Sequence, residues 1–187
     1  MQSLKAVLLV LLLFLIHSPA LGQKNDADSV ILLGRPYSFI LKAPSGWVLN
    51  EEAGKSQGLR AVLYKEGSSW KAAVAVMYVR VVQKDEAQPT LDKVVSNDIS
   101  DFLKQSPDSK VSDSKALKTG DKKQAIVKEF YDAANKNFES VAFIDESKVV
   151  VIVVLSSRNK DEFDKSISAF EALVGTYFFV GPSFNRQ

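Results

Sequence analysis

Carboxylates are the side chains of this sequence that could support acid–base or metal chemistry, because histidine and cysteine are nearly absent. The chain contains no cysteine and a single histidine, His17. Asp98 and Asp101 stand three residues apart on an expected helix and could share a cation, although a calcium site needs six or more oxygens. The adjacent pairs Asp85-Glu86 and Asp145-Glu146 point to opposite faces in a strand and both face water in a turn. A solvated surface therefore explains each pattern better than a catalytic dyad.

Nucleophilic catalysis has equally weak support. Serine is plentiful, but the sequence has no Gly-x-Ser-x-Gly elbow and no glycine-rich phosphate loop. Ser112 and Lys115 have the Ser-x-x-Lys spacing, yet they fall in an expected strand, where that spacing turns the two side chains to opposite faces. We therefore expect no catalytic residue, no metal and no cofactor, and we predict that the protein is not an enzyme.

Two groups of side chains are candidates for an interaction surface. Trp70, Tyr78 and Arg80 combine aromatic rings with a guanidinium, which is the composition of a binding hot spot, although ordinary packing also explains them. The second group is the densest basic cluster, which flanks one expected turn and could contact an acidic partner or lie solvated. Its members are Lys118, Lys122 and Lys123.

The N-terminus has the three parts of a secretory signal. Lys5 supplies the positive charge, Ala6 to Ile16 is an unbroken apolar run, and Ala20-Leu21-Gly22 is a small-x-small cleavage site. The run is shorter than the roughly 20 residues of a membrane-spanning helix, so no stable span is expected once the signal is cleaved. We therefore predict export to the periplasm or the extracellular space, and the lack of cysteine favours a bacterial envelope or an organelle lumen.

Charge and length set further bounds. The chain has 187 residues, with 24 basic and 22 acidic side chains interspersed along it. Nothing resembles the one-sided basic field of a nucleic-acid-binding protein, so no nucleic acid partner is expected. The length suits one domain. We divide it into a signal peptide (1–22), a flexible leader (23–36), a single domain (37–180) and a C-terminal tail (181–187).

The hydrophobic pattern predicts an α+β fold, with a mainly antiparallel sheet covered by two amphipathic helices. Helices are expected from Leu91 to Leu103 and from Asp161, whose apolar face runs from Phe163 to Phe178. Val149 to Leu155 is an unbroken apolar run and reads as a central strand. The expected strands are Tyr37–Lys42, Trp47–Asn50, Leu59–Tyr64, Lys71–Val82, Lys110–Leu117, Gln124–Tyr131, Phe138–Ile144 and Val149–Leu155.

Two stretches resemble the PsbP-like α/β/α sandwich proteins, which include exported bacterial members. One is the opening strand from Tyr37, which ends in Pro44-Ser45-Gly46-Trp47. The other is the apolar strand from Val149 with the aromatic-rich helix that follows. The resemblance implies accessory or binding roles without a shared catalytic set. Photosynthetic members use charged and histidine side chains to support a metal-dependent complex, and that role is not carried over because the expected mature chain has no histidine.

These observations favour an exported, non-catalytic accessory domain that acts through protein–protein contacts in the cell envelope. The sequence identifies neither the partner nor the oligomeric state. A first alternative is a carrier of a small apolar ligand between sheet and helix, with a cavity lined by Phe102, Phe163, Phe170 and Met77. A second is a carboxylate- or lysine-based enzyme, which requires a cleft that gathers distant acidic or lysine side chains.

Overall fold

The structure is a computed structural model that describes residues 29–34 and 37–181. The expected signal peptide and residues 182–187 lie outside the described residues. The described strands are β1 (Ser29–Gly34), β2 (Tyr37–Lys42), β3 (Trp47–Asn50), β4 (Ala61–Lys65), β5 (Ala75–Gln83), β6 (Lys110–Asp113), β7 (Leu117–Lys118), β8 (Gln124–Asp132), β9 (Asn137–Asp145), β10 (Val149–Ser157) and β11 (Phe178–Gly181). The helices are α1 (Leu91–Gln105), α2 (Lys160–Gly175) and a single 3-10 turn, η1 (Lys55–Gln57).

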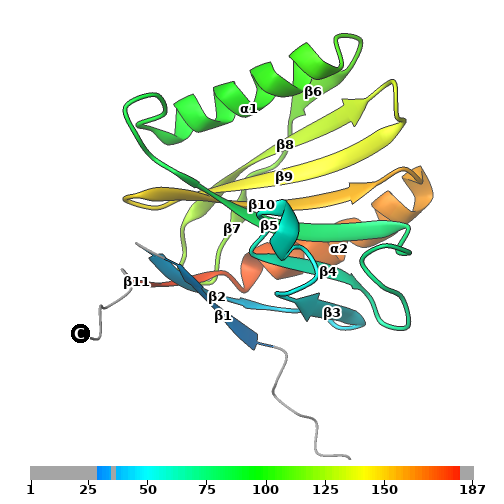
Figure 1. Cartoon of the computed structure of the whole chain (residues 1–187), viewed down its shortest axis with the longest axis horizontal. Coiled ribbons are helices and arrows are strands. Elements are labelled where there is room, and N and C mark those ends of the chain that lie inside the picture. The colour runs from blue at the N-terminus through cyan, green and yellow to red at the C-terminus, as the bar shows by residue number, and fades with distance from the viewer. Residues whose placement is uncertain (1–28, 35–36, 182–187) are drawn as a thin grey trace, which may run out of the picture.

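The strands form two antiparallel sheets (Figure 1). The large sheet has the order β3-β4-β5-β10-β9-β8-β6, with β7 paired to β8 beside this path. The small sheet has the order β1-β2-β11. Helices α1 and α2 pack on opposite faces of the large sheet, each over its own hydrophobic cluster. The predicted α+β class, with a mainly antiparallel sheet covered by two helices, is confirmed.

Strand β10 shows why the sheet needs a helix on each face. Successive side chains of a strand point to opposite faces, so an unbroken apolar run buries both. Val151, Val153 and Leu155 pack with the cluster under α2, whereas Val150, Ile152 and Val154 pack with the cluster under α1. All six are at most 1% exposed, which confirms the prediction of a central strand.

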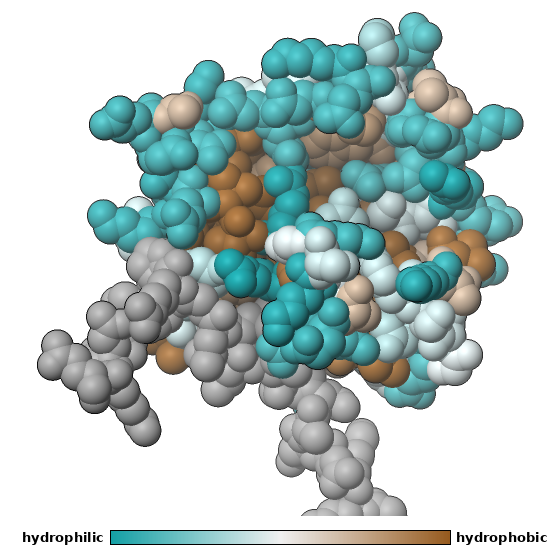
Figure 2. Space-filling model, viewed as in Figure 1, coloured by the Kyte–Doolittle hydropathy of each residue, from teal (hydrophilic) through white to brown (hydrophobic). Residues whose placement is uncertain are grey.

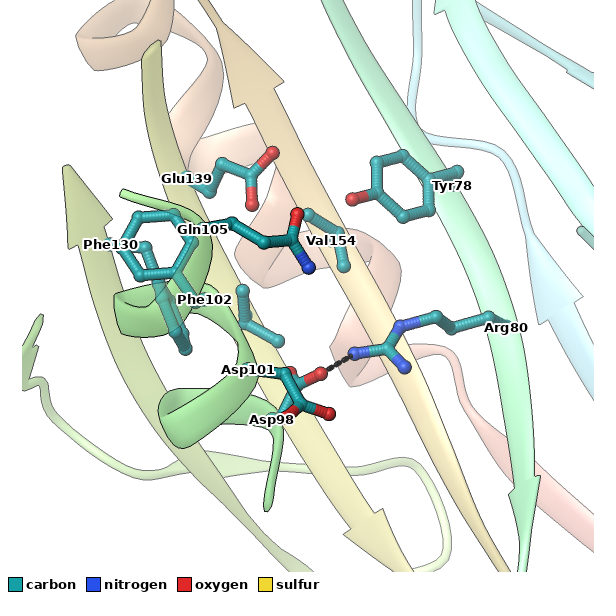
Figure 3. A pocket seen from close by; sticks show the side chains of 10 residues that line it. Tyr78, Arg80, Asp98, Asp101, Phe102, Gln105, Phe130, Glu139 and Val154 are labelled. Atoms are coloured by element: carbon teal, nitrogen blue, oxygen red, sulfur yellow. Dashed lines mark hydrogen bonds and ion pairs between the residues drawn. The ribbon is translucent and has the colours of Figure 1, made fainter. Parts of the chain in front are cut away.

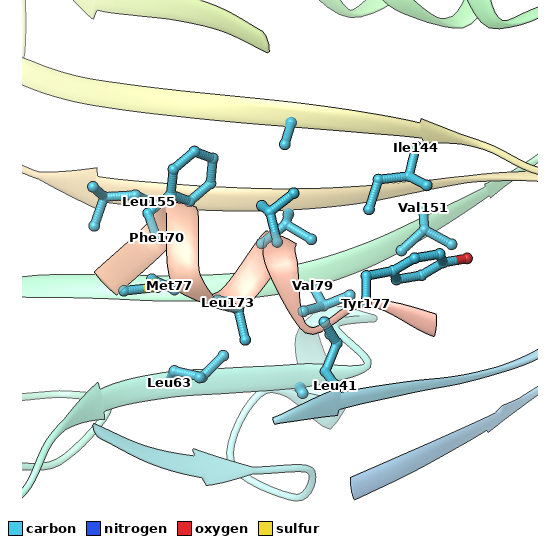
Figure 4. Close-up of a cluster of buried hydrophobic side chains, with 14 of the residues drawn as sticks. Leu41, Leu63, Met77, Val79, Ile144, Val151, Leu155, Phe170, Leu173 and Tyr177 are labelled. Atoms are coloured by element: carbon cyan, nitrogen blue, oxygen red, sulfur yellow. The ribbon is translucent and has the colours of Figure 1, made fainter. Parts of the chain in front are cut away.

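The core under α2 also anchors the small sheet. Figure 4 shows Phe170 and Leu173 of α2 pointing into side chains of the large sheet, with Leu41 of β2 at the end of the cluster. Tyr37, Phe39 and Leu41 lie at alternate positions of β2, and all three are buried in this cluster. The alternation of these apolar residues in the sequence therefore places one face of β2 against the core.

The leader predicted over 23–36 is wrong for residues 29–34, which form β1. This segment pairs antiparallel with β2, with Val30 opposite Leu41 and Leu32 opposite Phe39. The run Val30-Ile31-Leu32-Leu33 has the apolar, β-branched composition of a strand, and its polar neighbours hid that signal in the sequence. Residues 23–28 and 35–36 lie outside the described residues.

The C-terminal helix is shorter than its apolar pattern suggests. Helix α2 ends at Gly175, and Phe178–Gly181 forms β11, which pairs with β2. Phe178 is therefore not part of the apolar helix face, and half of its surface is exposed. Gly181 belongs to β11 and is therefore not part of the predicted tail, and residues 182–187 lie outside the described residues.

Two predicted strands have different limits in the structure. The strand predicted from Lys71 starts at Ala75, because the amides of Ala72 and Ala73 bond to the carbonyl of Ser69 in a turn. The strand predicted over 110–117 divides into β6 and the two-residue β7. Both β6 and β7 pair with β8, at its two ends.

Gly120 joins the β7–β8 hairpin to the end of α2. A Cβ atom at this position would lie 2.9 Å from the carbonyl oxygen of Tyr177 and 3.1 Å from that of Gly175. Both contacts involve backbone, which cannot rotate away as a side chain can. We expect Gly120→Ala to lower the free energy of unfolding by about 1–3 kcal/mol, as overpacking does, measured by urea denaturation.

Gly175→Ala is the matched control for this prediction. A Cβ atom at Gly175 meets nothing within 4 Å, and alanine is the better helix former. Gly175→Ala is therefore expected to be neutral or slightly stabilising. Equal stability of the two variants would show that the close approach at Gly120 does not constrain the hairpin.

Candidate binding site

Helix α1 brings three polar side chains to the large sheet. The hydroxyl of Thr90 caps the helix by accepting a bond from the amide of Lys93, and Val94 and Val95 are buried against the sheet. Asp98, Asp101 and Gln105 follow at spacings of three and four residues, which places them on one side of the helix. This side of the helix lies above the strands, next to the buried contact that Val94 and Val95 make with the sheet.

The strands supply the opposite wall. Tyr78 and Arg80 lie at alternate positions of β5 and face the α1 side, because their neighbours Met77 and Val79 are buried on the α2 side. Glu139 lies on β9, two residues before Val141, and shares its face. Strand pairing thus brings polar groups from distant parts of the sequence beside one helix.

These side chains line a pocket of about 240 Å³ between α1 and the sheet (Figure 3). A cavity of roughly 150 Å³ accommodates a benzene ring, so the pocket has room for a side chain or a small ligand. Figure 3 shows the Tyr78 hydroxyl, the Glu139 carboxylate and the Gln105 amide directed into the same space. Its lining residues are Tyr78, Arg80, Asp98, Asp101, Phe102, Gln105, Phe130, Glu139, Val141 and Val154.

The charges of the pocket are unevenly compensated. Arg80 forms an ion pair with Asp98, and Lys104 lies 3.1 Å from the Asp101 carboxylate. Glu139 accepts a hydrogen bond of 3.0 Å from the Asn137 side-chain amide. Within residues 29–34 and 37–181, however, no lysine or arginine lies within ion-pair distance of Glu139. It is thus the one carboxylate of the pocket lining without a counter-ion in that part of the chain.

Burial changes the proton affinity of two groups in the pocket. It raises the pKa of Glu139, and the nearby charge of Asp98 adds to this effect, while hydrogen bonds from Ser156 and Asn137 and the charge of Arg80 oppose it. Burial is also the main cause that raises the pKa of Tyr78, and the negative charge of Glu139 raises it further. The Tyr78 hydroxyl stays protonated at neutral pH, and it forms no hydrogen bond with any residue that the structure describes.

The raised pKa of Glu139 predicts a pH-dependent stability. A carboxyl group whose pKa is higher in the folded state stabilises the fold at low pH, and this contribution is lost as the pH rises through the folded pKa. Glu139→Gln removes the charge and keeps a side chain of the same size. We expect Glu139→Gln to raise the free energy of unfolding at pH 7.5 by about 0.5–2 kcal/mol, and to have less effect at pH 4. Thermal unfolding at the two pH values tests this, and a destabilised variant at pH 7.5 would contradict it.

The pocket opens into a wider hydrophobic surface. Figure 2 shows hydrophobic side chains exposed over β8, β9 and β10 beneath α1, framed by hydrophilic groups. Phe102 packs edge-to-face on Phe130 at 5.0 Å between ring centroids, and both rings are part of the pocket wall. Tyr78, Val82 and Ile126 are only partly buried on this face. Helix α1 therefore leaves part of its sheet face accessible.

The first predicted interaction group lies together at this site. Trp70 packs edge-to-face on Tyr78 at 6.3 Å between ring centroids, and Tyr78 and Arg80 line the pocket. Sequence reasoning missed Glu139 and Gln105. A signal for Glu139 was present, because it shares a strand face with Val141 and Phe143, and a lone charged residue on an apolar face is unusual.

The second predicted group does not form one solvated basic cluster. Lys118 and Lys122 are exposed, and Lys122 adopts a left-handed backbone conformation with φ of 72°. Lys123 is partly buried and forms an ion pair with Glu146. Only Lys118 and Lys122 therefore remain as exposed candidates, and none of the three lines the pocket beside α1.

Glu146 is buried, which corrects the expectation that both members of the Asp145-Glu146 pair face water. Only 5% of Glu146 is exposed, and its Oε1 accepts a hydrogen bond of 2.9 Å from the Tyr177 hydroxyl. Asp145 is exposed and lies 2.5 Å from Lys84. The two side chains thus point to different environments: Asp145 faces solvent, and Glu146 connects the β7–β8 hairpin to the residues after α2.

In the described part of the chain, the four side chains predicted to line an apolar carrier's cavity do not surround one common space. Met77 and Phe170 are at most 1% exposed within the core under α2, and Phe163 lies in the same cluster. Phe102 lies on the opposite face of the sheet, under α1. Because the sheet separates them, the four side chains cannot surround one ligand, and this carrier hypothesis is wrong in the form predicted.

The described part of the chain offers neither a metal centre nor a membrane span. No group of three or more histidine, cysteine, aspartate or glutamate side chains there could hold a metal ion. Over the same residues, none of the helices has the length and apolar character needed to cross a membrane.

Comparison with known proteins identifies the fold through structure and not through sequence. No family model matches the chain, and no curated protein matches it. The solution structure of the cyanobacterial PsbP, CyanoP, from Synechocystis matches with a TM-score of 0.51 at 14% identity, covering 84% of this chain and 96% of that one. The fold is PsbP-like.

A second solved structure has the same PsbP-like arrangement. It is LpqN of Mycobacterium tuberculosis, described as involved in cell envelope biogenesis. The TM-score is 0.57 at 15% identity, and the match covers 81% of this chain and 90% of LpqN. Neither structure is described as an enzyme. At these identities the matches establish the fold alone, and they agree with the predicted resemblance.

Proposed function

We propose that the protein is an exported, non-catalytic accessory module of the cell envelope that binds a partner protein in the pocket beside α1. The observation that carries this proposal is the pocket itself, where, among the described residues, the Tyr78 hydroxyl has no hydrogen-bond partner and Glu139 has no counter-ion, beside accessible apolar surface. A free polar side chain in a partly buried site is costly, and such sites are common where a ligand completes the hydrogen bonds.

The composition of the wall supports a protein partner. Aromatic rings and arginine are enriched at the centre of protein interfaces. Tyr78 and Arg80 line the pocket, and Trp70 packs on Tyr78 beside it. Beneath α1, the exposed hydrophobic surface extends the pocket over neighbouring strands (Figure 2). The likeness to LpqN, a protein involved in cell envelope biogenesis, is consistent with this location.

The pairing of charges favours binding over catalysis. A carboxylate-based enzyme uses two acidic groups with different protonation states at one reacting bond. Here Arg80 neutralises Asp98, and Lys104 pairs with Asp101. Glu139 is then the single carboxylate of the lining without a counter-ion among the described residues, and one such carboxylate does not make an acid–base pair.

The test blocks the pocket without altering its charge. Gln105 is exposed at the C-terminal end of α1 and lines the pocket, so Gln105→Trp places an indole across it. Wild-type and variant proteins, starting at Gln23, serve as bait in native envelope extract, with quantitative mass spectrometry as readout. We expect one stoichiometric partner that Gln105→Trp reduces at least tenfold.

Ala172→Trp supplies the matched control. Ala172 is exposed on α2, on the other side of the sheet, and the substitution adds the same ring without changing charge. Ala172→Trp is expected to retain the partner. Equal retention by Gln105→Trp and Ala172→Trp, or loss only with Ala172→Trp, would overturn the proposed docking site.

A further inference from the structure

We propose that the group which the partner inserts into the pocket is a basic side chain, arginine or lysine, and that Glu139 is its counter-ion. This inference rests on the proposed function and adds the chemistry of the contact. It is drawn from the geometry of the pocket, where one carboxylate has no cation within ion-pair distance and a tyrosine hydroxyl has no hydrogen-bond partner among the described residues.

The first step concerns the charge of Glu139. Arg80 is the one cationic side chain that lines the pocket, and its ion pair is with Asp98 on α1. Glu139 receives a neutral hydrogen bond from Asn137, which supports the carboxylate without compensating its charge. A partly buried carboxylate without a counter-ion carries a desolvation cost, and a cation inserted from outside would offset it.

The second step concerns the shape of the wall. A basic side chain has a long apolar stem and a charged end, so it needs an apolar channel that leads to an acceptor. Phe102, Phe130 and Val154 provide apolar surface in the pocket, and the Glu139 carboxylate lies beside them (Figure 3). The apolar side chains can therefore contact the stem of arginine or lysine while the carboxylate receives its charged end.

The third step concerns the two neutral polar groups. The Tyr78 hydroxyl and the Gln105 side-chain amide face the same space as the carboxylate (Figure 3). Both groups have an oxygen that accepts a hydrogen bond, and a guanidinium or ammonium has several donors to offer. The ring of Tyr78 can also hold a cation through its face. A neutral or anionic group would leave Glu139 unpaired, and an anion would be repelled by it.

The direct test uses small probes with the same shape and different charge. N-acetyl-arginine-amide and N-acetyl-lysine-amide are the cationic probes, and N-acetyl-citrulline-amide is the neutral analogue of the first. Two-dimensional NMR of the whole mature protein follows the methyl groups of Val141 and Val154 and the side-chain amide of Gln105, all in the pocket wall. We expect concentration-dependent shifts at these three residues with the cations, and at least tenfold weaker binding of citrulline.

Glu139→Gln and Glu171→Gln separate a specific effect from a change in net charge. Glu139→Gln should weaken the cationic probes at least tenfold, whereas Glu171→Gln, on the exposed face of α2, should leave them unchanged. Because Glu139→Gln is expected to be more stable than the wild type, loss of folding does not explain its result. Equal binding of citrulline, or unchanged affinity in Glu139→Gln, would overturn the inference.

The same variants distinguish this inference from the proposed function. If Gln105→Trp loses the captured partner and Glu139→Gln retains it in full, the pocket is a docking site and the assignment of a cation is wrong. If Gln105→Trp also retains the partner, the docking site itself is wrong. Loss of the partner in both variants, with retention in Glu171→Gln, is the result that the inference predicts.

Discussion

Glu146→Ala is expected to lower the free energy of unfolding by about 3 kcal/mol. The carboxylate of Glu146 is buried in the turn between β9 and β10, where it accepts from the Tyr177 hydroxyl and pairs with Lys123. Removing one partner of a buried ion pair costs about 3–5 kcal/mol, because the other charge stays desolvated. Lys123 is partly exposed, so we expect the lower end of this range.

Tyr177→Phe separates the contribution of the Tyr177 hydrogen bond from that of the ion pair, and Glu171→Ala is the control for removing an exposed glutamate. Tyr177→Phe removes one neutral donor and leaves the ion pair of Glu146, so a loss of about 1 kcal/mol is expected. Glu171 is exposed on α2, and Glu171→Ala should stay within about 0.5 kcal/mol of the wild type. Urea denaturation of the three variants gives the comparison. A Glu146→Ala protein as stable as Glu171→Ala would show that the buried network does not hold the turn to α2.

Phe130→Ala is expected to lower the free energy of unfolding by about 3 kcal/mol and to loosen α1. Phe130 of β8 is 4% exposed, and its ring packs edge-to-face on Phe102 of α1. Truncation of a buried phenylalanine leaves a cavity and costs about 3–5 kcal/mol. Because Phe102 lies in the last turns of α1, we expect faster hydrogen exchange at the C-terminal half of this helix than in β10.

Phe178→Ala is the control for the aromatic truncation. Phe178 lies on β11 and is half exposed, so its loss should cost less than about 1 kcal/mol and leave the exchange rates of α1 unchanged. Similar losses in Phe130→Ala and Phe178→Ala would contradict the account of how α1 is held. A uniform rise in exchange over α1 and α2 would contradict the local effect.

The sequence predicted the two-faced core because it depends on local periodicity. The apolar run of β10 requires cover on both sides, and the amphipathic patterns of α1 and α2 supply that cover. The capping residues Thr90 and Asn159 set the starts of the two helices, and both caps are present in the structure. Such signals lie within a few residues of the features that they determine.

The small sheet escaped prediction, although its strand β2 was expected, because neither neighbour of β2 was recognised as a strand. Strand β11 has only four residues, and its pairing with β2 joins segments from the two ends of the chain. The apolar face of α2 continues in sequence into Tyr177 and Phe178, so helical periodicity alone extends the helix too far. In the structure the residue after the helix, Thr176, accepts a hydrogen bond from the Lys42 amide of β2, and Gly120 of the β7–β8 hairpin lies close to the same segment, so the helix end depends on tertiary contacts.

The pocket was predictable only in part for the same reason. Tyr78 and Arg80 were identified by residue type, since aromatic and arginine side chains are typical of interfaces. Their meeting with Glu139 depends on the strand order β5-β10-β9, which brings segments about 60 residues apart to one face. The sequence also gives no sign that Lys123 would leave the basic cluster to pair with Glu146, because that contact depends on the register of two separate hairpins.

Site-specific photocrosslinking in the living cell tests the docking site most directly. A benzophenone amino acid replaces Gln105 at the pocket, and a second protein carries it at Ala172 on α2. We predict a crosslinked adduct with one partner protein from position 105 and none from position 172, with the adduct reduced at least tenfold by Glu139→Gln. An adduct from position 172 alone, or no difference between the two positions, would contradict the claim that the protein acts through the pocket beside α1.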